Sequence, residues 1–185
     1  MQAPILTSRD YFSSLIKAVE GIDAIAMTWA VDELARRLAK TSWVYVVGNG
    51  GSASTASHFA ADLNKNVEGD PDLFAHSPDS LAALTADAND NCYSAVFTDW
   101  LKRLEPDDED TLIAISTSGK SQNVLDAVAY AKSQGVHTVG LTGFDGGLLK
   151  TICDMEIRAT GDIIEIVEDC HMAILHSVIW KLKNG

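Results

Sequence analysis

The sequence predicts an α/β fold in which a five-stranded parallel sheet is covered by helices. The first observation is a set of short, largely apolar runs without polar alternation, as expected of strands buried on both faces. These runs are 43–48 (WVYVVG), 81–85 (LAALT), 111–116 (TLIAIS), 137–142 (HTVGLT) and 155–159 (MEIRA). The second observation is helical spacing of apolar residues between them. Regular alternation of strands and helices is typical of a parallel sheet.

The remaining segments complete a single domain spanning residues 1–185, a length that suits one domain. Apolar residues at helical spacing predict an N-terminal helical hairpin over about 9–40, broken near 21–23. The α/β core follows over about 43–160, and a long apolar helix ends the chain over about 162–183. Within the core, helices are expected at 52–65, 92–104 and 122–134, and surface loops at 66–80 and 105–110.

Composition limits the possible locations and partners. Hydrophobic residues make up 46% and charged residues 22% of the chain, and no apolar run approaches the length of a membrane span. The first residues do not resemble a secretory signal, so we expect a cytoplasmic protein. The net charge of −12 disfavours nucleic acid and anionic membranes as partners. Any anionic ligand must therefore be held by local geometry.

The first distinctive loop follows the first predicted strand. Gly48, Gly50 and Gly51 permit a sharp turn that brings backbone N–H groups near a ligand, and Ser52 can cap the next helix. A helix N-terminus facing such a turn suits an anion. The spacing through Ala53 also fits the loose dinucleotide fingerprint, but the acidic residue expected to close a second strand falls in the predicted loop EGDPD. A nicotinamide or flavin cofactor is therefore disfavoured.

The second distinctive loop, STSGKSQN, follows the strand at 111–116. Its hydroxyls, backbone amides and Lys120 can together hold a phosphomonoester without a metal. Only Gly119 precedes the lysine, so the spacing of a nucleotide-binding P-loop is missing and a triphosphate is disfavoured. Either loop alone could be an ordinary polar turn. Two of them at the carboxyl ends of parallel strands favour a shared ligand site.

Several segments together resemble the phosphoheptose isomerases of the sugar isomerase (SIS) superfamily. They are GNGGSA, SHFAADL, AND, AISTSGKSQNV, GLTGFDGG and VEDCHMAILH, in consistent order over about residues 10–183. The resemblance implies a three-layer αβα SIS-type sandwich and a homotetramer whose active sites are shared between subunits. It also implies an isomerase that converts sedoheptulose 7-phosphate to D-glycero-D-manno-heptose 7-phosphate, usually with zinc bound at the site.

The resemblance also assigns substrate-binding positions. Asn49 and Ser52 would contact the sugar or its phosphate, and Asp90 would contact sugar hydroxyls. The implied phosphate cradle consists of Ser116, Thr117, Ser118 and Ser121. Gly50 and Gly51 complete the predicted substrate-binding set through the backbone of the first turn.

The metal ligands implied for one zinc ion are His58, Asp62, Glu168 and His176, of which the last three are also candidate catalytic groups. His58 and Asp62 are four residues apart, so one helical face presents both as half of a zinc site. Glu168 and His176 are separated by roughly 80° and about 12 Å on a straight helix. We therefore expect them to approach one ion from different sides, or from different subunits.

Two of these positions depart from the family pattern, which usually has glutamate at Asp62 and glutamine at Glu168. A second carboxylate is compatible with zinc. Shortening the side chain at Asp62 moves its carboxylate by roughly 1 Å, and misplacement on that scale can cost about a hundredfold in rate. We expect Asp62 to serve chiefly as a ligand and Glu168 or His176 to move the proton.

The predicted reaction moves a proton between two carbons of a ketose phosphate through a metal-assisted enediolate. It needs a base, an acid for the oxygens and stabilisation of the enediolate charge, all of which carboxylates, imidazoles and zinc can supply. Two alternatives remain open. One is a noncatalytic SIS module that binds a sugar phosphate or a partner protein, like the relatives that attach to a replication initiator. The other is an isomerase of a different sugar phosphate.

Overall fold

The computed structural model describes residues 7–66 and 73–184. The strands are β1 (Trp43–Gly48), β2 (Phe74–His76), β3 (Thr111–Ser116), β4 (His137–Thr142) and β5 (Met155–Arg158). The first helices are α1 (Ser8–Glu20), α2 (Ala24–Leu38), α3 (Gly51–Asn66) and α4 (Leu81–Asp90). They are followed by the 3₁₀ turn η1 (Tyr93–Ala95), α5 (Val96–Leu104), α6 (Gln122–Ser133), α7 (Leu149–Ile152) and α8 (Ile164–Asn184).

The sheet is five-stranded and parallel throughout, in the order β2-β1-β3-β4-β5. This confirms the predicted α/β class. In the register of the strands, Gly48 of β1 lies opposite Ile115 of β3, and Ser116 lies opposite Thr142 of β4. The three central strands therefore end at the same level, and the loops that follow them leave the sheet side by side.

The predicted strand at 81–85 is wrong, because this segment begins helix α4. The Ser80 side chain accepts a hydrogen bond from the Ala83 N–H at 3.2 Å and caps the helix. Leucine and alanine favour helix over strand. The fifth strand is instead Phe74–His76, inside the predicted loop at 66–80, where it pairs with β1. Residues 67–72 of that loop lie outside the described residues.

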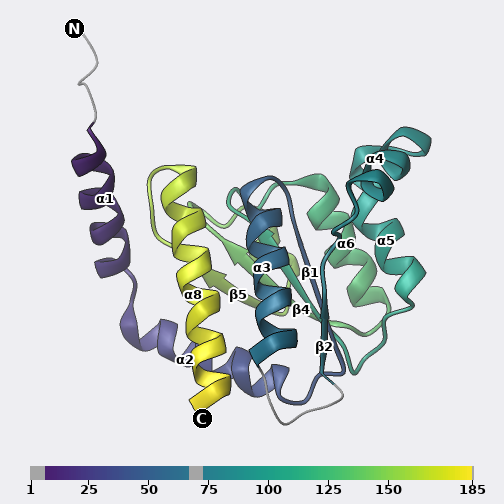
Figure 1. The fold of residues 1–185 in the computed structure, drawn as a ribbon, viewed down its shortest axis with the longest axis horizontal. Coiled ribbons are helices and arrows are strands. Elements are labelled where there is room, and N and C mark those ends of the chain that lie inside the picture. Colours follow the sequence, from purple (N-terminus) through teal and green to yellow (C-terminus); the bar gives the residue numbers. More distant parts are fainter. Residues whose placement is uncertain (1–6, 67–72, 185) are drawn as a thin grey trace, which may run out of the picture.

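The sheet separates two apolar cores, as expected of a three-layer sandwich (Figure 1). On one face, Val46, Ile113 and Leu141 point toward α2, α3 and α8. On the other face, Val47 and Leu112 pack with side chains of α5 and α6. Successive strand residues point to opposite faces, so strands buried on both sides carry apolar residues at every position. This explains why the runs found in the sequence lack alternation.

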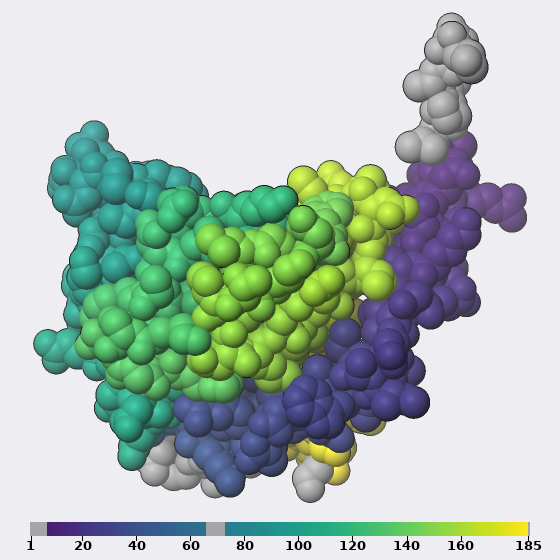
Figure 2. All heavy atoms as spheres, turned by 180° about the vertical axis from the view of Figure 1, so that it is seen from behind, coloured from purple at the N-terminus to yellow at the C-terminus, as the bar shows by residue number. Residues whose placement is uncertain are grey.

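The two predicted N-terminal helices are present and begin at capped residues. Thr7 and Asp10 form a capping box at α1, and the Asp23 side chain accepts from two N–H groups at the start of α2. The helices meet in an open bend rather than in the predicted hairpin, because each packs against α8 instead of against the other (Figure 1). From behind, they border one side and the lower edge of the domain (Figure 2). Across the described residues, every helix is too short or insufficiently apolar to span a membrane.

Candidate active site

The turn at residues 48–52 joins β1 to α3 and requires glycine at its first position. A Cβ atom on Gly48 would lie 2.8 Å from backbone atoms of Ser52, closer than real side chains approach. Gly50 has a φ of +54°, which side chains rarely adopt. Helix α3 then begins at Gly51, so its first N–H groups face the opening of the turn. The sequence prediction of a glycine turn leading into a helix is confirmed.

The loop at residues 116–121, between β3 and α6, is braced by the segment 143–149. Gly119 has a φ of +61°, and a Cβ atom there would lie 2.0 Å from the carbonyl oxygen of Gly146. Its own carbonyl accepts from the N–H groups of Leu148 and Leu149, both at 3.0 Å, and the Gly143 N–H donates to the Thr117 carbonyl at 2.9 Å. The GLTGFDGG motif therefore supports the second loop.

The two loops meet through their side chains. Asn49 in the turn and Asn123 in the first turn of α6 exchange hydrogen bonds between their amides at 2.9 and 2.8 Å. The Ser116 hydroxyl donates to Ser121 at 3.1 Å across the mouth of the second loop. Both loops therefore border one region at the carboxyl ends of adjacent strands, where ligands of parallel α/β folds bind.

Two residues of this region were missed by sequence reasoning. Asn123 lies within the quoted STSGKSQN segment, and its polar amide in the first turn of the predicted helix 122–134 was the available signal. Tyr93 donates its hydroxyl to the Asn49 Oδ1 at 2.8 Å. It lies three residues after Asp90, an exposed carboxylate that ends α4 and accepts a bond from Asn89. The chain after α4 therefore reaches the first turn through Tyr93.

Helices α3 and α8 bring together His58, Asp62 and His176. The Asp62 Oδ2 lies 3.4 Å from the His58 Nε2 and 3.7 Å from the His176 Nε2. One ligand atom from each residue lies within 4.8 Å of the others, and the two imidazole rings meet edge to face. Atoms sharing a tetrahedral zinc are separated by about 3.3 Å, given bond lengths of about 2.0 Å. This donor set fits zinc with only small side-chain adjustments.

Glu168 lies apart from that group, against the first turn of α3. Its carboxylate occupies the space that a Cβ atom on Gly51 would take, within 2.2 to 2.5 Å of that position. Burial and the neighbouring Glu165 raise the pKa of the Glu168 carboxyl, against the opposing effect of a hydrogen bond from the Ser52 N–H. The place of Glu168 as a fourth metal ligand stays a prediction. In the observed conformation, the Glu168 carboxylate places negative charge beside the turn at residues 48–52.

The second loop has the opposite electrostatic character. Lys120 is exposed, and its Nζ lies 3.5 Å from the Asp145 carboxylate, which is equally open to solvent. An exposed ion pair of this kind contributes little to stability in water, so Lys120 can leave Asp145 and bind a stronger anion. Ser116, Thr117 and Ser118 line the same loop, whose Gly119 N–H turns back to the Ser116 carbonyl. Hydroxyl groups and one ammonium group therefore converge there.

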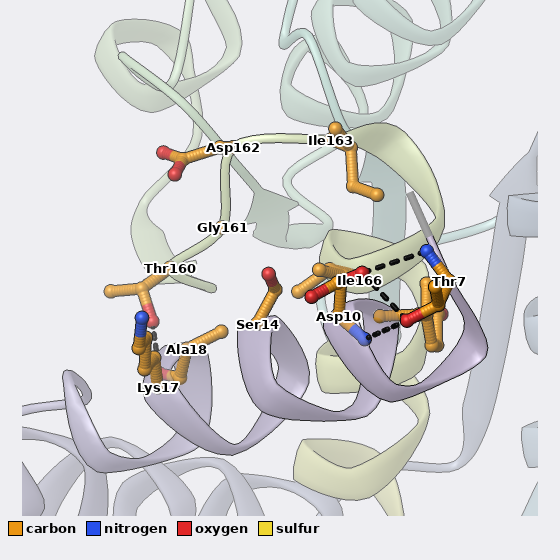
Figure 3. A pocket seen from close by; sticks show the side chains of 11 residues that line it. Thr7, Asp10, Ser14, Lys17, Ala18, Thr160, Gly161, Asp162, Ile163 and Ile166 are labelled. Carbon is orange, nitrogen blue, oxygen red and sulfur yellow. Dashed lines mark hydrogen bonds between the residues drawn. The ribbon is translucent and has the colours of Figure 1, made fainter. Parts of the chain in front are cut away.

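A cavity of 460 Å³ lies elsewhere, between α1 and the segment before α8 (Figure 3). Its lining contains no residue of either loop. Thr7 and Asp10 bond each other there, and the Thr160 hydroxyl donates to the carbonyl of Ala18. These polar groups serve helix capping and packing, so the chemistry lies with the two loops.

Known proteins resemble the chain over most of its length. The SIS domain family model matches residues 9–143. Phosphoheptose isomerase from Helicobacter pylori is 38% identical over 165 residues, which cover 88% of this chain and 85% of the relative. Phosphoheptose isomerase from Geobacter metallireducens is 38% identical over 144 residues, covering 76% and 75%.

Solved structures agree with the sequence relatives. A phosphoheptose isomerase from Francisella tularensis has a TM-score of 0.86 and 30% identity, covering 97% of this chain and all of that one. The phosphoheptose isomerase from Neisseria gonorrhoeae has a TM-score of 0.85 and 28% identity, covering 96% and 97%. The chain therefore belongs to the phosphoheptose isomerase family of SIS domain proteins.

Proposed function

We propose that this chain, a sugar-phosphate isomerase of the aldose–ketose type, converts sedoheptulose 7-phosphate to D-glycero-D-manno-heptose 7-phosphate. The observation that carries the proposal is the group of His58 and Asp62, on the helix that begins at the glycine turn, with His176 of α8. The names of the relatives from Helicobacter and Geobacter support the same substrate class.

The charges favour one orientation of the substrate. Lys120 and the hydroxyls of Ser116, Thr117, Ser118 and Ser121 suit the phosphate, because charge-assisted hydrogen bonds hold it without a metal. The turn at 48–52 has the Glu168 carboxylate beside Gly51, and a phosphate there would meet a like charge. The turn therefore suits sugar oxygens, bound by Asn49, Ser52 and the backbone of Gly50 and Gly51. Asp90 is proposed to accept from the sugar hydroxyls.

The proposed zinc ligands are His58, Asp62 and His176, with Glu168 as the fourth. The first three already lie together, and histidine nitrogen and carboxylate oxygen are ordinary zinc ligands. Glu168 would have to leave the turn to join them. When bound, the ion supplies Lewis-acid stabilisation of negative charge on the oxygens of the reacting carbons.

The proposed proton transfer uses side chains of the same group. His176 is half exposed and borders Asp62, so its imidazole can reach a substrate in the opening and move a proton. Asp62 contacts both imidazoles and keeps them oriented toward one point. Glu168, beside the turn that binds the sugar, is the second proposed base.

We further propose that the protein assembles as a homotetramer whose sites are shared between subunits. The supporting observation is a set of large apolar side chains exposed on the terminal helices. They are Phe12, Ile16 and Val19 on α1, Ile25 and Trp29 on α2, and Trp180 on α8. Their spacing of three or four residues places them on single helix faces, a pattern that marks an interaction surface. Light scattering of the purified protein measures the assembly.

The function is tested by incubating purified protein with sedoheptulose 7-phosphate and following the anomeric protons by NMR. We expect an aldose heptose phosphate to appear, with deuterium entering from heavy water at the carbon that exchanges its proton. A panel of five- and six-carbon ketose phosphates tests substrate choice. Chelation should slow turnover, and zinc should restore it. A protein without stoichiometric metal and without turnover on the whole panel would instead be a noncatalytic sugar-phosphate-binding module.

A further inference from the structure

We propose that Asn123 is a positioning residue that fixes the amide of Asn49 as a hydrogen-bond donor to the substrate, with Tyr93 closing the same network from outside. The inference rests on the proposed function for the identity of the substrate. Its structural part concerns three residues from three separate loops: the turn after β1, the start of α6 and the 3₁₀ turn η1.

The orientation of the network follows from one backbone group. The Val124 N–H can only donate, and it lies 3.0 Å from the Asn123 Oδ1. This oxygen therefore faces Val124 and Asn49, and the Asn123 Nδ2 donates to the Asn49 Oδ1 at 2.8 Å. The Asn49 Nδ2 must then donate to the Asn123 Oδ1 at 2.9 Å. In the reverse orientation, the Asn123 amide nitrogen would face the Val124 N–H, and two donors would meet without an acceptor.

The hydrogen-bonding capacity of Asn49 is nearly used up by these contacts. Its Oδ1 accepts from both Asn123 and Tyr93, which occupies the two lone pairs of a carbonyl oxygen. One of its two Nδ2 hydrogens is bound to Asn123. Among the bonds recorded for the described residues, a single N–H of this amide remains. Asn49 can therefore offer a donor to a sugar oxygen, but it has no acceptor left for a hydroxyl hydrogen.

Burial shows how the network is held. Asn123 is 3% exposed, so it forms a rigid inner end, whereas the Tyr93 side chain is 61% exposed and forms the outer end. As a donor to Asn49, the phenol oxygen retains lone pairs that can accept from a sugar hydroxyl. The two side chains therefore present complementary groups: a donor from Asn49 and an acceptor from Tyr93. Together they would select a substrate that carries adjacent carbonyl and hydroxyl oxygens.

A double-mutant cycle tests this role. Asn123→Asp keeps the acceptor for Val124 but replaces the donor to Asn49 with a second acceptor. We expect it to lower kcat/KM for the heptose phosphate by about tenfold, the effect of losing one well-formed hydrogen bond near the substrate. In an Asn49→Ala background the same change should alter kcat/KM by less than about twofold, because Asn123 acts through Asn49.

Gln122→Glu is the matched control. It adds the same charge one residue earlier, where the native amide donates to Asp126. Its effect should be equal in the two backgrounds. Tyr93→Phe removes a single hydroxyl from an exposed side chain. This variant should therefore fold even if Asn123→Asp proves unstable. It should raise KM by about threefold in the native background and leave the Asn49→Ala protein unchanged. Equal losses in both backgrounds for Asn123→Asp and Tyr93→Phe would overturn the proposal.

An independent readout separates this inference from the proposed function. In ¹⁵N NMR spectra of the free protein, the Asn49 amide should show one slowly exchanging proton and one fast proton. In Asn123→Ala, which removes the oxygen that accepts the slow proton, both should exchange rapidly. If the native protein turns over no sugar phosphate yet shows this pattern, the proposed substrate is wrong and the network stands. If both Asn49 protons exchange rapidly in the native protein, the positioning role is wrong whatever the activity.

Discussion

The turn at 48–52 and the loop at 116–121 begin from similar sequences but differ in support and charge. Both are rich in glycine and hydroxyl residues and follow adjacent strands. The first has open space around Gly50 and a carboxylate beside Gly51. The second is packed against the segment 143–149 and carries Lys120.

The difference shows that glycine serves two purposes in one site. In the first turn, Gly50 supplies a left-handed backbone conformation, and no atom of the described residues lies within 4 Å of where its Cβ would be. In the second loop, Gly119 allows two backbone segments to touch, since a Cβ atom would overlap the Gly146 carbonyl. A rigid loop that carries hydroxyl groups and Lys120 suits the phosphate that every substrate of the class shares. A more open turn near imidazoles and carboxylates suits the reacting end.

The largest effect is expected at the reacting end. His176→Ala removes an imidazole next to Asp62 and should lower kcat by about 10²- to 10⁴-fold, the usual contribution of a proton-transferring group. Zinc content measured on the same protein should also fall. His137→Gln, at the opposite end of the sheet, is the control and should retain activity. Full turnover by the His176→Ala protein would remove this residue from the mechanism.

The difference in backbone support is tested by one substitution in each loop. Gly50→Ala should destabilise folding by about 1 to 2 kcal/mol, since only the left-handed conformation is penalised. Gly119→Ala adds overpacking against Gly146 and should cost about 2 to 5 kcal/mol. Urea unfolding of the two variants gives both values. Equal losses would show that the second loop can shift away from its brace.

The difference in charge is tested at Lys120. Lys120→Ala should raise KM for the sugar phosphate by about three- to tenfold at low salt and leave kcat nearly unchanged, because the phosphate is bound equally before and during the reaction. The increase should shrink as salt rises. Lys102→Ala, on the surface of α5, is a matched control. A fall in kcat without a change in KM would place Lys120 at the reacting end instead.

The smallest effect concerns His171, which ties α8 to the brace of the second loop. Its buried Nε2 contacts the Thr142 carbonyl at 2.9 Å, one residue before the Gly143 N–H that bonds Thr117. Burial lowers the pKa of the His171 imidazole below its ordinary value of 6.5. A histidine with a depressed pKa stabilises the fold above that ordinary value, and this contribution is lost as the pH falls below it.

Urea unfolding between pH 7 and pH 5 therefore gives a testable slope. His171→Gln retains an N–H donor for the Thr142 carbonyl but cannot titrate. Its free energy of unfolding should decline less over this range than that of the native protein. If the two slopes are the same, protonation of His171 is not linked to folding.

The strands show where sequence patterns suffice. Four of the five were predicted within a residue or two, because continuous apolar runs follow directly from burial on both faces. The edge strand Phe74–His76 was missed, since three residues are too few to show a periodic signal. The segment 81–85 was read as a strand because it is apolar, although its leucines and alanines favour a helix once Ser80 caps it.

The candidate site was predicted in part for similar reasons. Motifs on single loops or helices, such as GNGGS and the pair His58 and Asp62, depend on short spacing that the sequence displays. The contacts of Asn123 and Tyr93 with Asn49 join residues that are distant in the chain, so no local sequence pattern predicts them.

The sequence by itself determined the parallel α/β class, the two polar loops and the types of chemical groups available, because backbone propensity and burial act locally. Only the tertiary structure decided that α8 brings His176 to Asp62, while leaving Glu168 at the turn. Only the tertiary structure decided, too, that the segment 143–149 supports the second loop. These outcomes depend on how helices and strands pack, and packing energies arise between residues that lie far apart along the chain.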